Sequence, residues 1–317
     1  MTDPFRPGSQ FKSRALPLSI AAAVVTAAGV LASTSPASAN SSPRQVVAVG
    51  AENQYANVIA QIGGRYVSVA AIMSDPNTDP HEFEASASVA EEVSQAQLIV
   101  QNGVGYDTFM NKIESATHRS DRQVIVAQEL LGVASDAFNP HLWYDPRTMP
   151  AIASAVATDL SRLEPAHSAY FMGNVKTFDH SLQPWLTAIA NFKKAHPGVP
   201  VAVTEPVADY MLQAAGADIK TPGPLQAAIM NGTDPSPQAI SLEEELLTKH
   251  EVKVFLYNQQ VTDSLTATFL SDATKAHVPV VGVYETMPTP GYDYQSWMMA
   301  ETNALRLALS GMSTVKL

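Results

Sequence analysis

The 317-residue sequence contains no cysteine. The chain can therefore form neither a disulfide nor a thiolate metal site, and any bound metal would depend on histidine and carboxylate ligands. The same absence excludes a lipid-modified cysteine as an attachment to a membrane. A chain of this length can bury a sizeable hydrophobic core without cross-links.

Positive charge is also scarce. Lysine and arginine number 19 against 30 aspartates and glutamates, for a net charge of −11. Such a surface disfavours nucleic acid or an anionic membrane as a partner and attracts cations, although it also serves plain solubility. We expect no nucleic-acid partner.

Only one long apolar run occurs, and it lies at the start of the chain. Arg6, Lys12 and Arg14 precede an uncharged Ala/Val/Leu-rich stretch over 15–32, and a small-residue cleavage site, Ala37-Ser38-Ala39, follows. This pattern is typical of a secretory signal peptide over 1–39, with an uncleaved membrane anchor as the alternative. Subtracting the segment's net +2 from −11 leaves −13 for the remaining chain. We therefore expect an exported protein, periplasmic or extracellular.

The common catalytic motifs are missing. His81-Glu82 begins like the zinc metalloprotease motif, but Ala85 stands where the second histidine should be. Gly103-Val104-Gly105 lacks the third glycine of a dinucleotide-binding loop, and no Gly-x-Ser-x-Gly elbow is present. The sequence does not favour an enzyme.

From Arg44 onward, short β-rich runs alternate with helical patterns, which predicts an α/β fold with mostly parallel sheets. The predicted strands are 45–49, 66–72, 98–100, 124–126, 199–203, 218–220, 252–257 and 278–283. The predicted helices are 53–62, 88–95, 106–115, 148–163, 166–195, 207–215, one starting near 241, and 294–309.

The helix over 166–195 divides the chain. A helix of about 30 residues is about 45 Å long, the scale of a whole domain, so it predicts a strut between two lobes. We expect an N-terminal lobe over 40–163, a linking helix over 164–198 and a C-terminal lobe over 199–317. Pro184 predicts a kink or a short break in this helix.

Local signals set several helix starts. Ser88-Val89-Ala90-Glu91 reads as a capping box, and Ser241-Leu242-Glu243-Glu244 as another helix start. Asp145 is expected to cap the helix that follows it, with Pro146 at its first position. The Pro/Gly-rich stretch Thr221–Pro237 is predicted to be a loop.

Two similar sequence motifs give the strongest indication of the chemistry. Asp79–Glu84 reads DPHEFE and Asn139–Pro146 reads NPHLWYDP, so each places a histidine after a proline and before a large apolar residue. Proline stiffens both loops. Because both loops follow strands, where ligands of parallel sheets collect, we expect His81 and His141 to meet at one metal ion.

The second half offers carboxylates in equivalent places. Glu205 and Glu285 each follow a predicted strand, and two imidazoles with two carboxylates suit Zn²⁺, Mn²⁺ or Fe²⁺. The alternatives are a helix-start role for Glu205 and replacement of Glu285 by Asp293. His118, His167, His180, His196, His250 and His277 are scattered, and we expect them to be solvated or to cap helices.

These motifs together resemble the substrate-binding proteins of metal-specific ABC importers, the zinc/manganese family with two lobes joined by a rigid helix. The resemblance rests first on the two Pro-His motifs. It also rests on Thr204-Glu205 with Tyr210, and on Glu285 followed by Gly291, Tyr294 and Asn303. Gln101-Asn102-Gly103 and Gln259-Gln260 fit the family as well. It spans Arg44 to Leu317. Glu285 departs from the family's usual aspartate, and the histidine-rich loop of typical zinc members is absent.

The resemblance implies a binding protein that captures Zn²⁺ or Mn²⁺, with Fe²⁺ as a third option, between the lobes. His81 and His141 would bind from one lobe and Glu205 and Glu285 from the other. The partner would be a membrane permease with its ATPase, and we expect the protein to be a monomer. The alternatives are an exported metal-dependent hydrolase using the same ligands and, as proposed for some relatives, a surface adhesion protein.

Overall fold

A computed structural model describes residues 45–316, so the expected signal peptide lies outside the described part. All eight predicted strands are present, within three residues of the expected ends. The first sheet contains β1 (Val46–Glu52), β2 (Val67–Met73), β3 (Leu98–Gln101) and β4 (Gln123–Val126); the second contains β5 (Pro200–Val203), β6 (Asp218–Ile219), β7 (Val254–Asn258) and β8 (Val280–Val283).

Both sheets are parallel and repeat one topology. The strand orders are β2-β1-β3-β4 and β6-β5-β7-β8. Strands β3, β7 and β8 are buried along their whole length, as expected for parallel strands covered on both faces. In each sheet the order reverses beside the first strand, and ligands of such sheets bind at the carboxyl ends next to this point.

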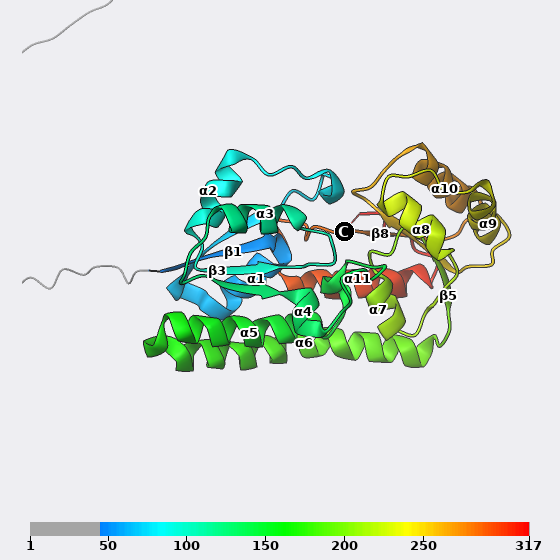
Figure 1. Cartoon of the computed structure of the whole chain (residues 1–317). Helices are drawn as coiled ribbons and strands as arrows, with labels where there is room; N and C mark the ends of the chain where they lie inside the picture. The colour runs from blue at the N-terminus through cyan, green and yellow to red at the C-terminus, as the bar shows by residue number, and fades with distance from the viewer. Residues whose placement is uncertain (1–44, 317) are drawn as a thin grey trace, which may run out of the picture. The chain divides into compact units, whose positions relative to one another are not determined.

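The helices cover these sheets (Figure 1). In the first lobe they are α1 (Asn53–Gly63), α2 (Ala87–Gln95), α3 (Thr108–Ala116), α4 (Ala127–Leu131) and α5 (Thr148–Leu163). After α6 (Ser168–Ala195) follow α7 (Asp209–Ala214), α8 (Gly223–Met230), α9 (Pro237–Thr248), α10 (Ser264–Lys275) and α11 (Tyr294–Ala308). Gly50 allows α1 to fold back on β1, because a Cβ there would lie 2.3 Å from the Ala56 nitrogen.

Helix α6 joins the lobes, as expected. It contacts α1 and α5 in one lobe and α7 and α11 in the other, and it lies along one side of both (Figure 1). Helix α11 adds a second connection, because it contacts β8, α6 and α1. One hydrophobic cluster contains residues of both lobes, including the chain's three tryptophans, Trp143, Trp185 and Trp297.

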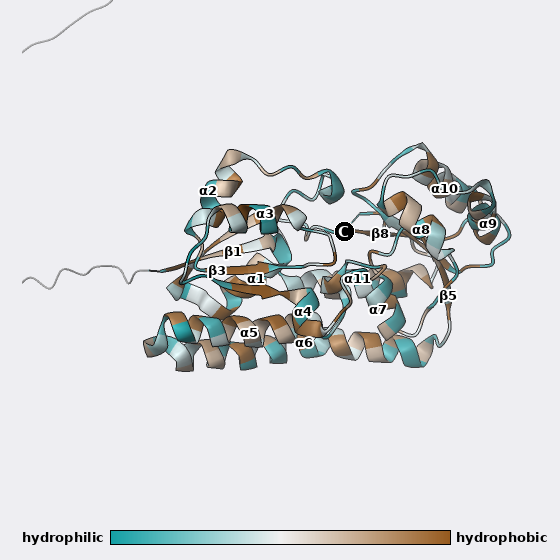
Figure 2. Cartoon of the chain, in the orientation of Figure 1, coloured by the Kyte–Doolittle hydropathy of each residue, from teal (hydrophilic) through white to brown (hydrophobic). Residues whose placement is uncertain are grey.

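The hydropathy pattern explains this packing. Figure 2 shows apolar strands β1 and β3 inside the first lobe, while α5 and α6 are banded with apolar and polar residues. On α6 the apolar positions that become buried include Phe171, Phe178, Leu182 and Trp185. They recur at helical spacing on one face, so the helix buries this face against both lobes and leaves the other in solvent.

Several local expectations were wrong. Helix α6 runs through Pro184, so the short break expected there is absent. The Thr221–Pro237 stretch contains α8, in which proline in the first turn costs no helical hydrogen bond. Helix α5 begins at Thr148, and Asp145 instead accepts the Arg147 N–H at 2.9 Å in the turn before it.

Two helices are capped earlier than predicted. Ser86 caps α2 through the Val89 N–H, and Ser236 caps α9 through the Ala239 N–H. The serines at 88 and 241 lie inside these helices. Helices α4 and α10 were not predicted. Within residues 45–316, no helix combines the length and the apolar character needed to cross a bilayer.

Candidate metal centre

The His81 loop follows β2 at the edge of the first sheet. A short 3-10 turn, Pro80–Glu82, carries the histidine, and the Asp79 side chain accepts the His81 N–H at 2.8 Å. Proline at the first position suits such a turn because its missing N–H would have no partner there. The His81 side chain is 24% exposed, so it lies at the boundary between the site and solvent.

His141 is completely buried and its ring orientation is fixed. The Asn139 side-chain nitrogen donates to the Pro206 carbonyl at 2.7 Å, which leaves the Asn139 amide oxygen as an acceptor. That oxygen lies 2.8 Å from Nδ1 of His141, so Nδ1 carries the proton. In the neutral ring Nε2 then presents a lone pair.

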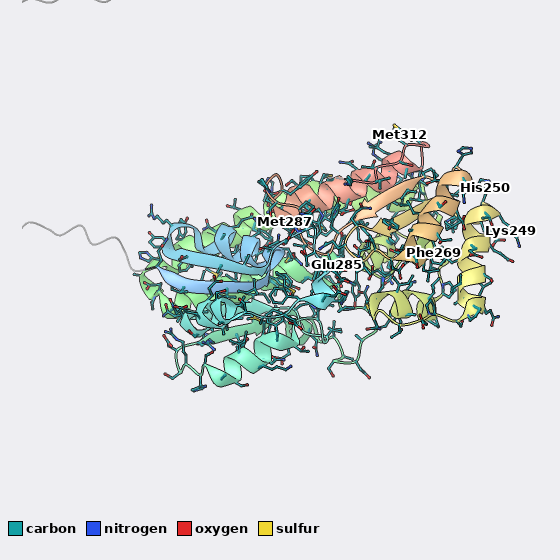
Figure 3. All side chains as sticks on the ribbon, turned by 90° about the horizontal axis from the view of Figure 1, so that it is seen from above. Lys249, His250, Phe269, Glu285, Met287 and Met312 are labelled. Atoms are coloured by element: carbon teal, nitrogen blue, oxygen red, sulfur yellow. The ribbon has the colours of Figure 1, made fainter. Side chains whose placement is uncertain are left out.

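Glu285, two residues after β8, meets both histidines. Its Oε2 lies 3.1 Å from Nε2 of His141 and 3.3 Å from Nε2 of His81, and the Tyr106 hydroxyl donates to the same oxygen at 2.8 Å. Potential ligand atoms of the two histidines and Glu285 all lie within 4.8 Å of one another. Figure 3 shows Glu285 between the two lobes.

The arrangement at His141 requires a cation. With Nδ1 protonated, the lone pair of Nε2 in the neutral ring faces a carboxylate oxygen 3.1 Å away, and two acceptors at this distance repel each other. A proton or a metal ion between them removes the repulsion. The site therefore fits a cation held by imidazole nitrogen and carboxylate oxygen.

Glu205 lies beside this cluster, following β5. The structure groups His81, His141 and Glu285, and Glu205 joins them through Asn258. Glu205 is 2% exposed and its Oε2 has no hydrogen-bond partner. An unpaired buried oxygen is costly, and a bound cation would supply the missing partner.

Each of these groups changes the pKa of its neighbours. Burial raises the pKa of Glu285, but His141 and His81 outweigh burial and hold this pKa well below its usual range. The pKa of Glu205 is raised well above its usual value by burial and by the negative charge of Glu285. Burial favours the neutral form of both imidazoles; it lowers the pKa of His141, whereas the hydrogen bond and charge of Glu285 raise that of His81 overall.

A cavity of about 350 Å³ opens onto the cluster at His81. Residues of both lobes line it, among them Tyr106, Phe138 and Pro140 from the first and Met230 from α8 in the second. The cavity therefore reaches the cluster from between the lobes at His81, its partly exposed member.

Other predicted residues have different roles. Asp293 is exposed and caps α11 by accepting the Ser296 N–H, so its place in the fold is away from the cluster. Glu82 and Glu84 are exposed as well. Sequence reasoning missed Tyr106 and Asn258, although Asn258 could have been found as a polar residue ending a buried strand.

Comparison with known proteins identifies the family of this chain. The family model described as "Zinc-uptake complex component A periplasmic" matches residues 49–308. The zinc-binding protein TroA of Treponema pallidum is 27% identical over 152 residues, covering 46% of this chain and 48% of TroA. The manganese-binding lipoprotein MntA of Bacillus subtilis is 24% identical over 149 residues, covering 45% and 48%. The matched part of this chain thus spans about half the length of these curated relatives.

Solved structures show the same fold. The periplasmic zinc-binding protein TroA superposes with a TM-score of 0.71 at 17% identity, covering 85% of this chain and 100% of that one. The binding protein FpvC of Pseudomonas aeruginosa, in complex with Mn²⁺, gives 0.68 at 18% identity over 84% and 98%. Because the family model matches residues 49–308, this chain belongs to the family of periplasmic zinc-uptake complex components.

Proposed function

We propose that this protein captures a divalent transition metal ion, Zn²⁺ or Mn²⁺, outside the cytoplasm and delivers it to an ABC importer. The observation that carries the proposal is the meeting of two imidazole Nε2 atoms with the Glu285 carboxylate. Two nitrogen and two oxygen ligands suit Zn²⁺, and they also accept Mn²⁺ or Fe²⁺.

The proposed ligands are His81, His141, Glu205 and Glu285. Ligand atoms of His81, His141 and Glu285 lie within 4.8 Å of one another, and the unpaired Oε2 of Glu205 is the available fourth donor. Two carboxylates neutralise the charge of a divalent ion, which lowers the cost of burying it. Tyr106 orients Glu285, and Asn139 orients His141.

Delivery requires partners that recognise the loaded protein. Family members work with a membrane permease and its ATPase, and we propose the same for this chain. The basic and apolar pattern over 1–39 supports export by a cleaved signal peptide. Four ligands from the protein would leave no position for a catalytic water, so transport is favoured over hydrolysis.

The test is metal stoichiometry. The purified protein should bind one Zn²⁺ or Mn²⁺ ion per chain, measured by elemental analysis and competition with a chelator. His81→Ala and His141→Ala should each lose tight binding, while His180→Ala, which removes an exposed histidine of α6, should not. Full stoichiometry in both site variants would contradict the proposal. Turnover of peptide, ester or phosphoester substrates by the metal-loaded protein would favour the hydrolase.

A further inference from the structure

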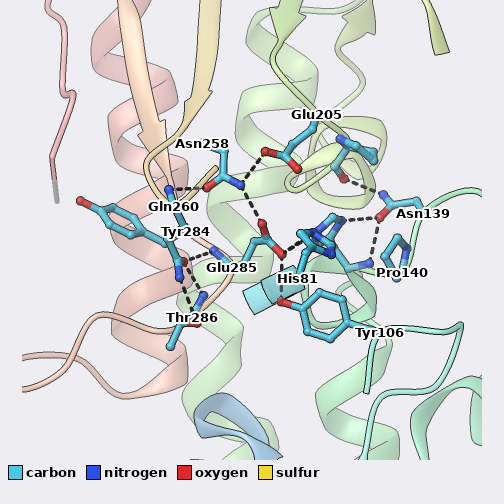
Figure 4. Close-up of polar contacts among 12 residues, drawn as sticks. His81, Tyr106, Asn139, Pro140, Glu205, Asn258, Gln260, Tyr284, Glu285 and Thr286 are labelled. Atoms are coloured by element: carbon cyan, nitrogen blue, oxygen red, sulfur yellow. Dashed lines mark hydrogen bonds and ion pairs between the residues drawn. The ribbon is translucent and has the colours of Figure 1, made fainter. Parts of the chain in front are cut away.

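The amide of Asn258 lies between the two carboxylates of the candidate metal centre (Figure 4). Its Nδ2 donates to Oε1 of Glu205 and to Oε1 of Glu285, each at 2.7 Å. A primary amide nitrogen has two hydrogens, so these two bonds use its whole donor capacity. Asn258 therefore holds one oxygen of each carboxylate.

The orientation of this amide is fixed from the other side. The Gln260 backbone N–H donates to Oδ1 of Asn258 at 3.0 Å, and a flipped amide would bring two donors together. The backbone N–H of Asn258 donates to the Thr204 hydroxyl at 3.0 Å. Asn258 is 0% exposed, so water cannot substitute for any of these partners.

Gln260 also restrains Glu285. Its side-chain oxygen accepts the N–H groups of Glu285 and Thr286, each at 2.8 Å, and its side-chain nitrogen donates to the Thr78 carbonyl in the His81 loop at 2.8 Å. The backbone that carries Glu285 is thus held from within its own lobe and tied to the other. This leaves the carboxylate little freedom to turn away from Asn258.

Asn258 does not hold the second oxygen, Oε2, of either glutamate. Oε2 of Glu285 faces both histidines, and Oε2 of Glu205 has no partner. A bidentate carboxylate turns both of its oxygens toward one ion. The bonds from Asn258 restrain the rotation that would bring Oε1 of Glu205 or Glu285 to the ion, so Oε2 is the oxygen that each glutamate presents.

We propose that Asn258 sets the metal preference of the site by limiting both glutamates to one coordinating oxygen, which favours Zn²⁺ over Mn²⁺. The inference rests on the proposed function. Two nitrogens and two oxygens make the four-ligand set typical of zinc, whereas Mn²⁺ favours more oxygen ligands and six-fold coordination. Without Asn258, two bidentate carboxylates would raise the number of oxygen ligands from two to four.

The test replaces Asn258 by leucine, which has a similar size and no donor. Zn²⁺ and Mn²⁺ affinities are measured by chelator competition at one pH. We expect the Zn²⁺ affinity of Asn258→Leu to fall about ten- to hundredfold, the range typical for loss of a group that orients metal ligands. Mn²⁺ affinity should fall less or rise, so the ratio should shift at least about tenfold toward Mn²⁺. X-ray absorption of the Mn²⁺-loaded variant should show more oxygen neighbours than the wild type.

A merely structural role gives a different result. If Asn258 only stabilises the fold, both affinities fall equally and the ratio stays constant, which would overturn the inference. Asn258→Ala serves if the leucine variant does not fold, because it also removes both donors. Asn174→Leu, which loses an amide hydrogen bond to the Ile62 carbonyl, is the matched control and should keep both affinities. If the wild type binds neither ion, the proposed function itself is overturned. If the wild type binds metal but the ratio of Zn²⁺ to Mn²⁺ affinity is unchanged in the variants, only the role of Asn258 is overturned.

Discussion

At the scale of single residues, Asn139 decides which nitrogen of His141 faces the site. Its amide accepts from Nδ1 of His141 and donates to the Pro206 carbonyl in the other lobe. Groups that hold the second nitrogen of a metal-binding histidine typically change metal affinity by about 10- to 100-fold when removed.

Asn139→Ala should therefore weaken metal binding by about this factor without abolishing it, as measured by chelator competition. The ring can then adopt the other tautomer, so part of the population presents a protonated Nε2. Asn174→Ala controls for the loss of an amide elsewhere. Unchanged affinity in Asn139→Ala would mean that packing alone orients His141.

The buried carboxyl group of Glu301 should make the stability of the protein depend on pH. Burial raises its pKa to about 8; one oxygen accepts from Tyr144 and Trp297, and the other has no partner. Between the ordinary carboxyl pKa and about 8, the folded protein keeps a proton that the unfolded chain releases. The free energy of unfolding then falls as pH rises, by up to about 1.4 kcal/mol per pH unit from this group.

Glu301→Gln removes this contribution because glutamine does not titrate. Relative to the wild type, the metal-free variant should gain stability steadily from pH 5 to pH 8 in urea unfolding. Glu243, whose pKa burial also raises to about 8, is present in both proteins. The stability of the variant itself will therefore still fall as pH rises. Glu92→Gln, at an exposed position, is the control for losing a carboxyl group. A constant stability difference across this range would show that Glu301 is ionised in the folded protein.

At the scale of elements, the strands were predictable, whereas the capping residues of α2 and α9 were not. Runs such as Val-Val-Gly-Val in β8 are apolar throughout because both faces of a parallel strand are covered. Serine occurs twice near the starts of α2 and α9, and only the backbone geometry shows which one is the cap. Ser236, rather than Ser241, accepts the Ala239 N–H at 3.2 Å at the start of α9.

This difference predicts unequal effects of two similar substitutions. Ser236→Ala should lower the free energy of unfolding by about 1 kcal/mol, because it leaves a helix N–H without its acceptor. Ser241→Ala lies within α9 and should be neutral or slightly stabilising, since alanine has the higher helix propensity. Denaturant unfolding of both variants checks this. Equal losses would assign the serines a role other than capping.

The sequence identified candidate ligands but missed the groups that hold them in place. The two Pro-His motifs and the two glutamates after strands indicate candidate ligands, because the carboxyl ends of parallel strands lie together at one edge of a sheet. The hydrogen bond from Tyr106 to Glu285 depends on how the two lobes meet, and the one from Asn258 depends on the pairing of β7 with β8. Neither is visible in a local pattern. That Glu285, rather than Asp293, meets the histidines is likewise a result of the tertiary structure.

At the scale of the whole molecule, the two lobes are held together in more than one way. Besides α6 and α11, the Asn53 side chain exchanges two hydrogen bonds with the backbone of Met287, at 2.8 and 3.0 Å. The shared hydrophobic cluster continues from one lobe into the other. Closed cores and rigid helices resist hinge motion, so a wide opening of the cleft would break well-packed contacts.

Metal binding should therefore leave the overall dimensions unchanged while ordering the site locally. We expect the same radius of gyration with and without Zn²⁺ in small-angle scattering. Hydrogen exchange should slow in the His81 loop, over 74–83, and around Glu285, where the ligands join both lobes. At a free metal concentration about 1,000 times the Kd, mass action alone should add about 4 kcal/mol to the free energy of unfolding. A clear decrease in the radius of gyration on adding metal would instead indicate closure of the lobes, and the connection through α6 and α11 would then have to bend.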